Sequence, residues 1–345
     1  MPGFARRQLL TATLVAGLSA PLCAQEREQL VEGARKEGQL ALAHSVSLAS
    51  FPRFMQAFEA KYPFIQTAPG LYGAPTGRVL ARVEGEIRAR ALSFDVLHVA
   101  SLAPFLGLSR QGLLADYQSP ELAAYPPEAH DRGQWATARI VGVIMAYNRN
   151  VLRADLVPKS WADLLRPEFK DRKLIIQDAA AGTCFNQMYM LGKTLGQGFL
   201  ERLGAQRPIV VATAAQLIDM LVRGEAIVGA TVDHYRAFEP DPVKAGIVGV
   251  YPTEGMPLAA APIAIFNDAP HPKAARLFED FVLSAEGQEL LNTQIFQTYS
   301  MRTGFRPPPG QLPLAETKPM IPTDLRDYEQ AAQHFPETFD DLFKA

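Results

Sequence analysis

Three adjacent polar residues, Asp233, His234 and Tyr235, follow a short apolar run in the second half of the chain. The run, residues 224–232, is too short for a helix and favours a buried strand. Its carboxyl end would present a carboxylate, an imidazole whose charge varies near neutral pH and a phenol that can stack or hydrogen-bond. In open α/β sheets ligands bind at this end of the strands. We therefore expect these residues to form one wall of a ligand cleft.

Small hydroxyl residues and a glycine stand at four other places where a predicted strand gives way to a helix. Backbone N–H groups at a helix start attract anions without the help of a basic side chain. Ordinary capping, worth about 1 kcal/mol, explains any single one of these turns at least as well. Four such turns in one chain nevertheless favour a site for an oxyanion. The residues concerned are Ser45, Ser47, Thr76, Ser101, Gly182 and Thr183.

Alternating strand and helix patterns surround these turns. Residues 39–45 are expected to form an apolar strand, 51–62 an amphipathic helix and 64–67 a second strand, an order that implies parallel pairing with a right-handed crossover. The chain after residue 305 is weakly patterned until a last helix near 324–334. Further strands are expected at 94–99, 140–147, 173–177, 209–212 and 261–266, and further helices at 26–37, 78–91, 184–195, 213–223 and 272–283.

Composition limits the classes of function. The 345 residues are enough for two domains with sizeable cores, and the hydrophobic (48%) and charged (20%) contents are those of a globular protein. A net charge of −2 predicts no nucleic-acid partner. Of the two cysteines, Cys23 lies in a segment expected to be removed, which leaves no disulfide framework.

The first 24 residues are expected to be a cleaved export signal. Arg6 and Arg7 supply a positive end, residues 9–22 an apolar stretch, and Leu22-Cys23-Ala24 a cleavage site. The segment beginning at Arg6 also resembles a twin-arginine signal without its full consensus, so the export route stays open. The residues before Cys23 make a poor lipidation motif. The sequence therefore predicts an exported, periplasmic protein.

Several short segments, in this order and spacing, resemble the type 2 periplasmic solute-binding proteins, specifically the iron(III)-type family that serves ABC transporters. The resemblance covers nearly the whole mature chain. The segments are Phe94-Asp95-Val96, Gly112-Leu113-Leu114, Val143 to Asn148, Pro158 to Leu164, Pro252-Thr253-Glu254-Gly255, and Ala274 to Phe281 leading to Ser284-Ala285-Glu286-Gly287-Gln288.

The resemblance implies a periplasmic-binding-protein type 2 fold: two α/β domains with mixed central sheets joined by hinge strands. Domain I would hold 37–144 plus 258–305 and domain II 145–257 plus 306–345. A small solute would bind between them, closure would be a hinge motion, and the closed form would dock on the membrane permease of an ABC importer. The protein would act as a monomer without a cofactor.

The family's iron ligands are only partly present. Iron-binding members hold Fe³⁺ with a His, a Glu and two adjacent Tyr, and hard, anionic oxygen ligands suit a trivalent cation. By spacing, these positions fall at Ser47, near Ala100, and at His234 and Tyr235. Because a single phenol remains, we predict no direct metal site. The alternative is a ferric carrier that uses Tyr235, His234 and an exogenous anion.

The remaining constellation favours a small organic anion or polar solute of phosphonate, phosphate ester or carboxylate type. In branches of the family with organic ligands, acidic positions matching Asp233 and Glu254 bind hydroxyl or amino groups. A capping role for Asp233 and a solvated loop for Glu254 explain the two acids equally well. A periplasmic enzyme on the same fold is the alternative of another class, but no nucleophile elbow, zinc motif or phosphate-binding loop is present. Cys184 is expected to be a buried structural residue.

Overall fold

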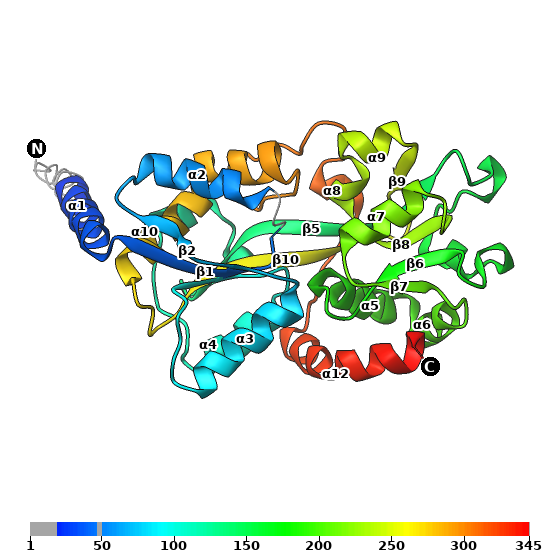
Figure 1. Ribbon diagram of the computed structural model, residues 1–345, viewed down its shortest axis with the longest axis horizontal. Coiled ribbons are helices and arrows are strands. Elements are labelled where there is room, and N and C mark those ends of the chain that lie inside the picture. Colours follow the sequence, from blue (N-terminus) through cyan, green and yellow to red (C-terminus); the bar gives the residue numbers. More distant parts are fainter. Residues whose placement is uncertain (1–18, 47–49, 345) are drawn as a thin grey trace, which may run out of the picture.

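The computed structural model describes residues 19–46 and 50–344 and consists of two α/β lobes placed end to end (Figure 1). Two long strands, β5 (Trp135–Asn148) and β10 (Met256–Ile265), run through both lobes. The predicted signal residues Arg6 and Arg7 lie outside the described residues, and so does Ser47. No helix in the described part of the chain has the length and apolar character needed to cross a membrane.

The first lobe is built on a mixed sheet. Strand β1 pairs in parallel with β2 and with β3, whereas β10 pairs antiparallel with β3 and with β5. This parallel β1–β2 unit with a helix between its strands is the arrangement that the sequence predicts. The strands of the first lobe are β1 (Gln39–His44), β2 (Gln66–Gly73), β3 (Val96–His98) and β4 (His130–Asp131).

The second lobe repeats the scheme around the far half of β5. Strand β5 pairs antiparallel with β8 and β9, and β8, β6 and β7 follow in parallel. The apolar run predicted as a strand at 224–232 forms β8 only from Val228, and the strand includes Asp233 as its last residue. The strands of the second lobe are β6 (Leu174–Gln177), β7 (Ile209–Val211), β8 (Val228–Asp233) and β9 (Ile247–Val250), and β11 (Pro319–Met320) pairs with β10.

Helices cover both faces of each sheet. In the first lobe these are α2 (Phe51–Lys61), α3 (Thr76–Arg88), α4 (Ala103–Arg110), α10 (Pro272–Leu283), α11 (Ala285–Gln288) and the π-helical turn η6 (Glu289–Ile295), while α1 (Ser19–Glu37) packs on α10 at the end of the lobe. In the second lobe they are α5 (Gly182–Leu195), α6 (Gln197–Gly204), α7 (Ala214–Val222), α8 (His234–Ala237) and α9 (Pro240–Lys244). Short 3₁₀ turns lie at Pro120–Ala124, Pro127–Ala129, Ala154–Leu156, Trp161–Leu165, Pro167–Phe169 and Leu314–Thr317.

Successive side chains of β1 point to opposite faces of the sheet, so the core of the first lobe is divided into two clusters. Leu40 and Leu42 pack with the aromatic face of α2, while Ala41 and Ala43 pack on the side of α3 and α4. The α2 residues Phe51, Phe54, Met55 and Phe58, at helical spacing in the sequence, are all buried there. By the same alternation, His44 at the end of β1 lies on the face covered by α2, as Leu40 and Leu42 do.

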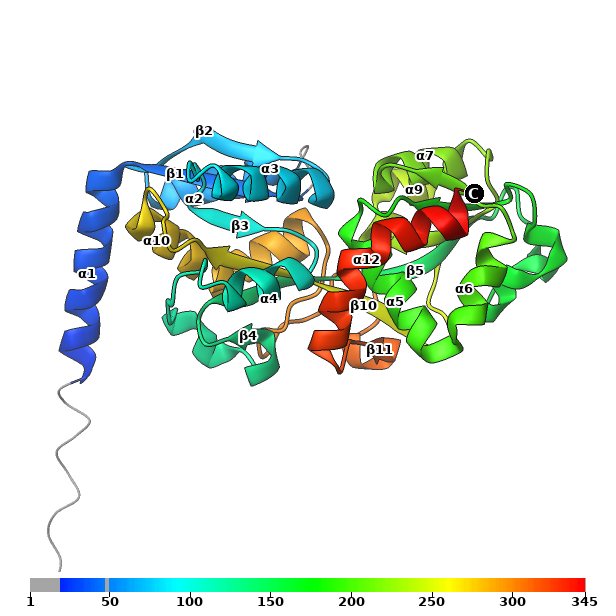
Figure 2. The ribbon, with the colours of Figure 1, turned by 90° about the horizontal axis from the view of Figure 1, so that it is seen from below.

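The last helix, α12 (Leu325–Phe343), is longer than the predicted helix near 324–334, because it continues through Pro336 and does not end before it. Its aromatic residues Tyr328, Phe335 and Phe339 belong to the core of the second lobe. Its amino-terminal part contacts α4 of the first lobe (Figure 2). The helix therefore bridges the two lobes on one side of the molecule.

The mixed α/β architecture with crossing strands agrees with the fold class expected from the sequence. Buried amides brace the crossing: the Nδ2 of Asn292 and the Nε2 of Gln288 both donate to the carbonyl of Ala138 on β5. The domain boundaries given above remain a prediction.

Candidate functional site

A groove of about 720 Å³ lies where the two lobes meet. It is lined from the first lobe by Thr76 and Ser101, at the starts of α3 and α4, and from the second lobe by Gly182 at the start of α5. The backbone N–H of Gly77 donates to the carbonyl of Ala180 across this junction, at 3.2 Å. Three of the residues predicted from strand-to-helix turns are therefore brought together.

Gly182 is where the lobes approach most closely on this side. A Cβ built at this position would lie 2.2 Å from the carbonyl oxygen of Ala100, a backbone atom that cannot move away cheaply. The glycine is thus required because the backbones of the two lobes approach closely here, and not because of an unusual backbone angle.

Arg139, on β5 at the crossing between the lobes, is the main residue that the sequence analysis missed. Its side chain is only 3% exposed, and its one hydrogen bond to the described residues runs from Nε to the Nε2 of His98, at 3.4 Å. It forms no ion pair with any carboxylate in residues 19–46 or 50–344, although Tyr235 and Asp233 lie near enough for their charges to act on it. Burial lowers the pKa of this guanidinium, because a buried charge without a paired carboxylate is costly, while those two groups act in the opposite direction.

Two histidines flank Arg139 from the first lobe. His44 and His98 end the neighbouring strands β1 and β3, are directly paired in register, and are 1% and 3% exposed. Burial, followed by the nearby Arg139 charge, lowers the pKa of His44 to about 4 and that of His98 to about 3. Both rings are therefore neutral at neutral pH. We name Arg139, His98 and His44 the Arg139 cluster.

The second lobe faces this cluster with Asp233 and Tyr235. The carboxylate of Asp233 accepts from the Nε2 of Gln177 at 3.3 Å, and burial raises its pKa although hydrogen bonds from Thr183 and Gln177 act in the opposite direction. Tyr235 is 8% exposed, and burial raises the pKa of its phenol. The charges of Arg139 and of Arg236, which pairs with Glu239 at 2.8 Å, act on both residues.

His234 is fully buried between Tyr299 and the backbone of Gly142, outside the Arg139 cluster. Its ring stacks on Tyr299, with centroids 4.7 Å apart, and its Nδ1 lies 3.0 Å from the backbone nitrogen of Gly142. Burial lowers its pKa to about 3. The ring is therefore neutral near neutral pH and does not vary in charge there, contrary to what the sequence suggests. Its Nε2 has no partner among the described residues, so donation to a ligand stays a prediction.

The side chains of Glu254 and Ser45 both accept hydrogen bonds from backbone N–H groups of the protein. The carboxylate of Glu254 accepts from the backbone nitrogens of Trp161, at 3.0 Å, and Ala162, at 3.2 Å, so it caps a 3₁₀ turn of the second lobe. The hydroxyl of Ser45 accepts from the backbone nitrogen of Ala100 at 3.0 Å, joining two of the strand-to-helix turns. Ser45 thereby shapes the edge of the first lobe that faces the second.

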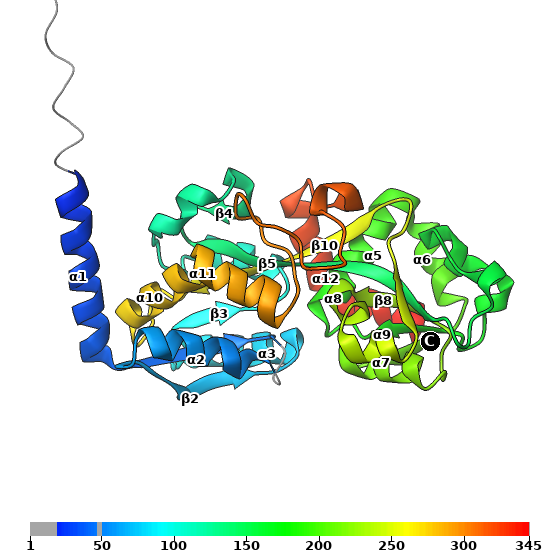
Figure 3. The same cartoon turned by 90° about the horizontal axis from the view of Figure 1, so that it is seen from above.

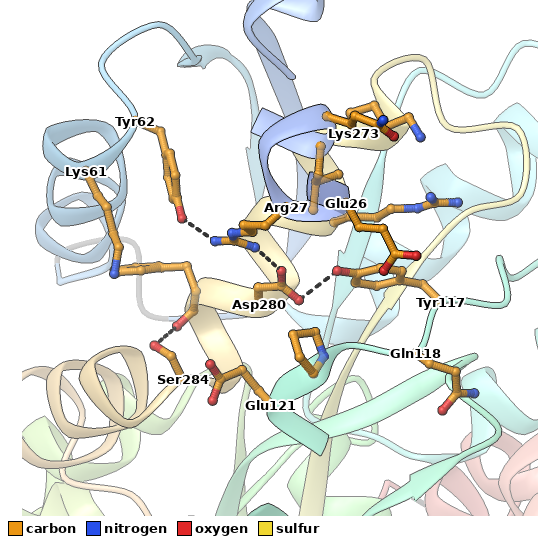
Figure 4. Close-up of a pocket in the computed structure, with 15 residues that line it drawn as sticks. Glu26, Arg27, Lys61, Tyr62, Tyr117, Gln118, Glu121, Lys273, Asp280 and Ser284 are labelled. Atoms are coloured by element: carbon orange, nitrogen blue, oxygen red, sulfur yellow. Dashed lines mark hydrogen bonds and ion pairs between the residues drawn. The ribbon is translucent and has the colours of Figure 1, made fainter. Parts of the chain in front are cut away.

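A second hollow, of about 730 Å³, lies on the first lobe between α1 and α10 (Figure 4). At its centre Asp280 accepts hydrogen bonds from Tyr117, at 2.9 Å, and Ser119, at 2.7 Å, and forms an ion pair with Arg27. Arg27 also donates to the hydroxyl of Tyr62, at 2.7 Å. The central polar groups of this hollow therefore satisfy one another.

Metal and nucleophile chemistry find little support in the described residues. Residues 19–46 and 50–344 contain no group of three or more His, Cys, Asp or Glu side chains arranged to hold a metal. Cys184 is buried and contacts the carbonyl of Gln177, and burial raises the pKa of its thiol well above the usual value. A thiol of this kind is a packing residue, because the thiolate is the reactive form.

The Arg139 cluster left a signal in the sequence. Arg139 is the one charged residue in the run WATARIVGVIMAYN, residues 135–148, and a charge inside a strand buried on both faces is rare without a partner. His44 and His98 each close an apolar strand, as Asp233 does. The same reasoning that selected Asp233 would have selected them.

A family model described as bacterial extracellular solute-binding protein matches residues 98–328, more than half of the chain. The chain belongs to this family. A Haemophilus influenzae protein described as uncharacterized is 26% identical over 293 residues, which cover 81% of this chain and 80% of that protein.

Solved structures with the same fold are periplasmic binding proteins. AfuA from Actinobacillus pleuropneumoniae, with exogenous fructose-6-phosphate bound, is 23% identical, with a TM-score of 0.78 and coverage of 89% of this chain and 99% of that one. The periplasmic binding protein P5PA is 21% identical (TM-score 0.77, coverage 89% and 99%). Iron-bound HitA from Pseudomonas aeruginosa is 24% identical (TM-score 0.75, coverage 87% and 99%).

The protein is accordingly a bacterial extracellular solute-binding protein, which binds a small solute. The type 2 fold expected from the sequence is confirmed. The family and these structures are binding proteins and not enzymes.

Proposed function

We propose that the protein captures a small organic anion, of the phosphonate, phosphate ester or carboxylate type, between its lobes, with the anionic group on Arg139. The observation that carries the proposal is that the buried Arg139 forms no direct ion pair with a carboxylate of the described residues, since Asp233 acts on it only from beyond ion-pair distance. A guanidinium withdrawn from water needs a negative partner, and an anionic solute supplies one only when bound. Closure of the lobes around the solute would then be coupled to neutralisation of this charge.

Asp233 and Tyr235 supply the opposite wall of the proposed site. A buried carboxylate that retains free acceptor capacity suits a hydroxyl or amino group of the solute, and the phenol suits stacking or a hydrogen bond. A solute with an anionic group at one end and a hydroxyl or amine at the other fits both walls. The sugar phosphate held by AfuA is a molecule of this kind.

The ferric alternative, with Tyr235 and His234 as ligands, is less well supported. The ring of His234 lies against Tyr299 and Gly142, and its centroid is 5.9 Å from that of Tyr235. The guanidinium groups of Arg139 and Arg236, close enough to Tyr235 to affect its pKa, would repel a trivalent cation. Iron-bound HitA keeps this alternative worth testing.

The remaining features of the proposal concern the whole protein. We propose that residues 1–24 are a cleaved export signal, that the mature protein acts as a monomer, that it performs no chemistry on its solute, and that no cofactor is needed. Mass spectrometry of protein purified from the periplasm checks the cleavage site, and light scattering checks the oligomeric state.

A ligand screen tests the proposed function. Protein purified from the periplasm is heated with phosphonates, phosphate esters, carboxylates and polyamines, and a visible spectrum is recorded with Fe³⁺-citrate. A solute present at 100 times its Kd should stabilise the fold by about 2.7 kcal/mol. Stabilisation by an anionic compound that disappears in Arg139→Gln supports the proposal. Stabilisation by polyamines alone, or a strong tyrosinate-to-iron absorption band, overturns it.

A further inference from the structure

The Nε2 atom of His44 is a buried polar atom without a partner among the described residues. The side chain is 1% exposed and its ring packs on Phe51, with centroids 4.2 Å apart. Its register partner on β3 is His98, which contacts Arg139, so His44 belongs to the same face of the sheet edge. Buried polar atoms of native proteins are nearly always hydrogen-bonded. Ten other buried side-chain atoms of the described residues also lack a partner, and this one is informative because it lies at the strand end beside Arg139.

The other ring nitrogen of His44 fixes the tautomer. The backbone N–H of Val46 donates to Nδ1 at 3.2 Å, so Nδ1 must carry a lone pair. In a neutral imidazole the remaining nitrogen then carries the hydrogen. Nε2 of His44 is therefore a hydrogen-bond donor with nothing in the described part of the protein to accept from it.

His98 has the opposite tautomer. Its Nδ1 lies 2.8 Å from the carbonyl oxygen of Pro262, which can only accept, so Nδ1 carries the hydrogen. Nε2 is then the acceptor for the Nε–H of Arg139. This contact leaves the two terminal nitrogens of the guanidinium to donate elsewhere. The two neighbouring histidines thus differ in chemistry: one offers a donor and the other orients the cation.

We infer that His44 is a ligand-binding residue that donates an N–H from a neutral ring to the oxyanion held by Arg139, and that His98 is a positioning residue for that arginine. The inference rests on the proposed capture of an anion. In this proposal the two terminal nitrogens of the guanidinium and the imidazole N–H, which lies near enough to Arg139 for its charge to act on the ring, donate to the same anionic group. Three terminal oxygens, as in a phosphate monoester or a phosphonate, match these donors better than the two coplanar oxygens of a carboxylate.

The donor set does not depend on protonation of His44. The groups that face its ring are Arg139 from β5, His98 from β3 and the apolar Phe51 from α2, together with the Val46 N–H. A second proton on the ring would meet the Val46 N–H and the arginine charge. Capture of an anion of constant charge should therefore be nearly independent of pH between about pH 5.5 and about pH 8.

Paired substitutions test the role of the Nε2–H. The amide nitrogen of Gln lies near the place of Nε2, whereas that of Asn lies near Nδ1, so His44→Gln keeps the donor and His44→Asn removes it. We expect His44→Gln to bind within about 5-fold of the wild type and His44→Asn to bind at least about 30-fold more weakly. The probes are 2-aminoethylphosphonate, fructose 6-phosphate and inorganic phosphate, measured by titration calorimetry. Equal losses in both variants overturn the inference.

Nuclear magnetic resonance of the ligand-free wild type gives an independent result. Nitrogen-15 shifts should show His44 neutral with its hydrogen on Nε2, and His98 neutral with its hydrogen on Nδ1, at about pH 6. A hydrogen on Nδ1 of His44, or a doubly protonated ring, overturns the inference even where variants fail to fold. Failure of the wild type to bind any of the probes overturns the proposed function, whatever the tautomers.

His98 has a readout of its own. The Nε–H signal of Arg139 should be protected from exchange with water in the wild type and should lose this protection in His98→Asn, which keeps a donor for Pro262 but has no acceptor in place of Nε2. Thermal unfolding checks that the variant is folded. Unchanged protection in a folded His98→Asn overturns the positioning role.

Discussion

Two buried ionic groups of this protein, Asp280 and Arg139, have opposite surroundings. Asp280, in the first lobe, accepts from Tyr117 and Ser119 and pairs with Arg27 (Figure 4). Arg139, at the crossing of the lobes, has a neutral histidine as its one hydrogen-bond partner among the described residues. Asp280 is therefore paired within its own lobe, whereas Arg139 has no direct ion pair among the described residues, which is why we propose it as the place of an anionic solute.

The largest expected effect is the loss of solute binding in Arg139→Gln. Removal of the cation should weaken binding by at least about 100-fold, because a charge-assisted pair in a closed site is lost. The free energy of unfolding should stay the same or increase, because an uncompensated buried charge is removed. Calorimetric titration and urea unfolding measure the two quantities. An Arg139→Gln variant that unfolds at lower urea concentration but binds solute normally would mean that Arg139 stabilises the fold and does not bind the solute.

Asp280→Asn should show the opposite pattern. The free energy of unfolding should fall by about 2–4 kcal/mol, because Arg27 loses its charged partner and several hydrogen bonds weaken. Solute affinity should change less than 2-fold in the folded fraction, about the error of such titrations. Arg153→Gln, which breaks an exposed ion pair with Asp155, is the matched control and should affect neither quantity.

A third prediction concerns acid stability. His44, His98 and His234 have folded-state pKa values of about 4, about 3 and about 3, below the unfolded value of 6.5. The unfolded chain therefore takes up protons first, and the free energy of unfolding should fall as pH decreases from about 6.5 towards about 4, by about 1.4 kcal/mol per pKa unit of each histidine.

Unfolding curves at several pH values check this slope. His44→Gln should flatten it, since the substituted residue no longer titrates. A slope unchanged from that of the wild type would mean that His44 takes up its proton at the same pH in the folded and the unfolded protein.

The smallest expected effect concerns the contact between α4 and α12. Arg110 of the first lobe donates to Glu329 of α12 at 2.6 Å, and the carboxylate is 6% exposed. Because α12 is anchored in the core of the second lobe, opening of the lobes would break this pair (Figure 2). Glu329→Gln should weaken solute binding by about 3-fold through a less stable closed form. An increase in the solution radius of the bound protein, measured by X-ray scattering, would accompany it.

Much of the fold follows from the sequence pattern. The alternation of β1 with α2 and the aromatic spacing of Phe51, Phe54 and Phe58 specify a parallel sheet edge covered by a helix, because each pattern has one way to bury its apolar face. Strand β2 was placed too early and too short, at 64–67 instead of Gln66–Gly73, because its carboxyl half is only partly buried and lacks an apolar pattern. The extent of α12 was underestimated because Pro336 suggests a helix end.

The candidate site was only partly predictable. Thr76, Ser101 and Gly182 were found because strand-to-helix turns have a local signature, and they line one groove. Arg139 was missed because its importance comes from partners it lacks, a property of the three-dimensional structure. The ring of His234 turns to Tyr299 and not to the open edge, and local sequence does not say which way a side chain at a strand end will turn. Seen from above, α8 lies against β5, which is the contact that directs this ring (Figure 3).

Gly182 has a consequence for engineering. Since its Cα rests against the carbonyl of Ala100, a single added methyl group would act as a wedge between the lobes. A Gly182→Ala protein would keep every side chain of the Arg139 cluster and yet be unable to complete its closure. Such a variant would bind its solute without reaching the closed conformation that we propose for delivery.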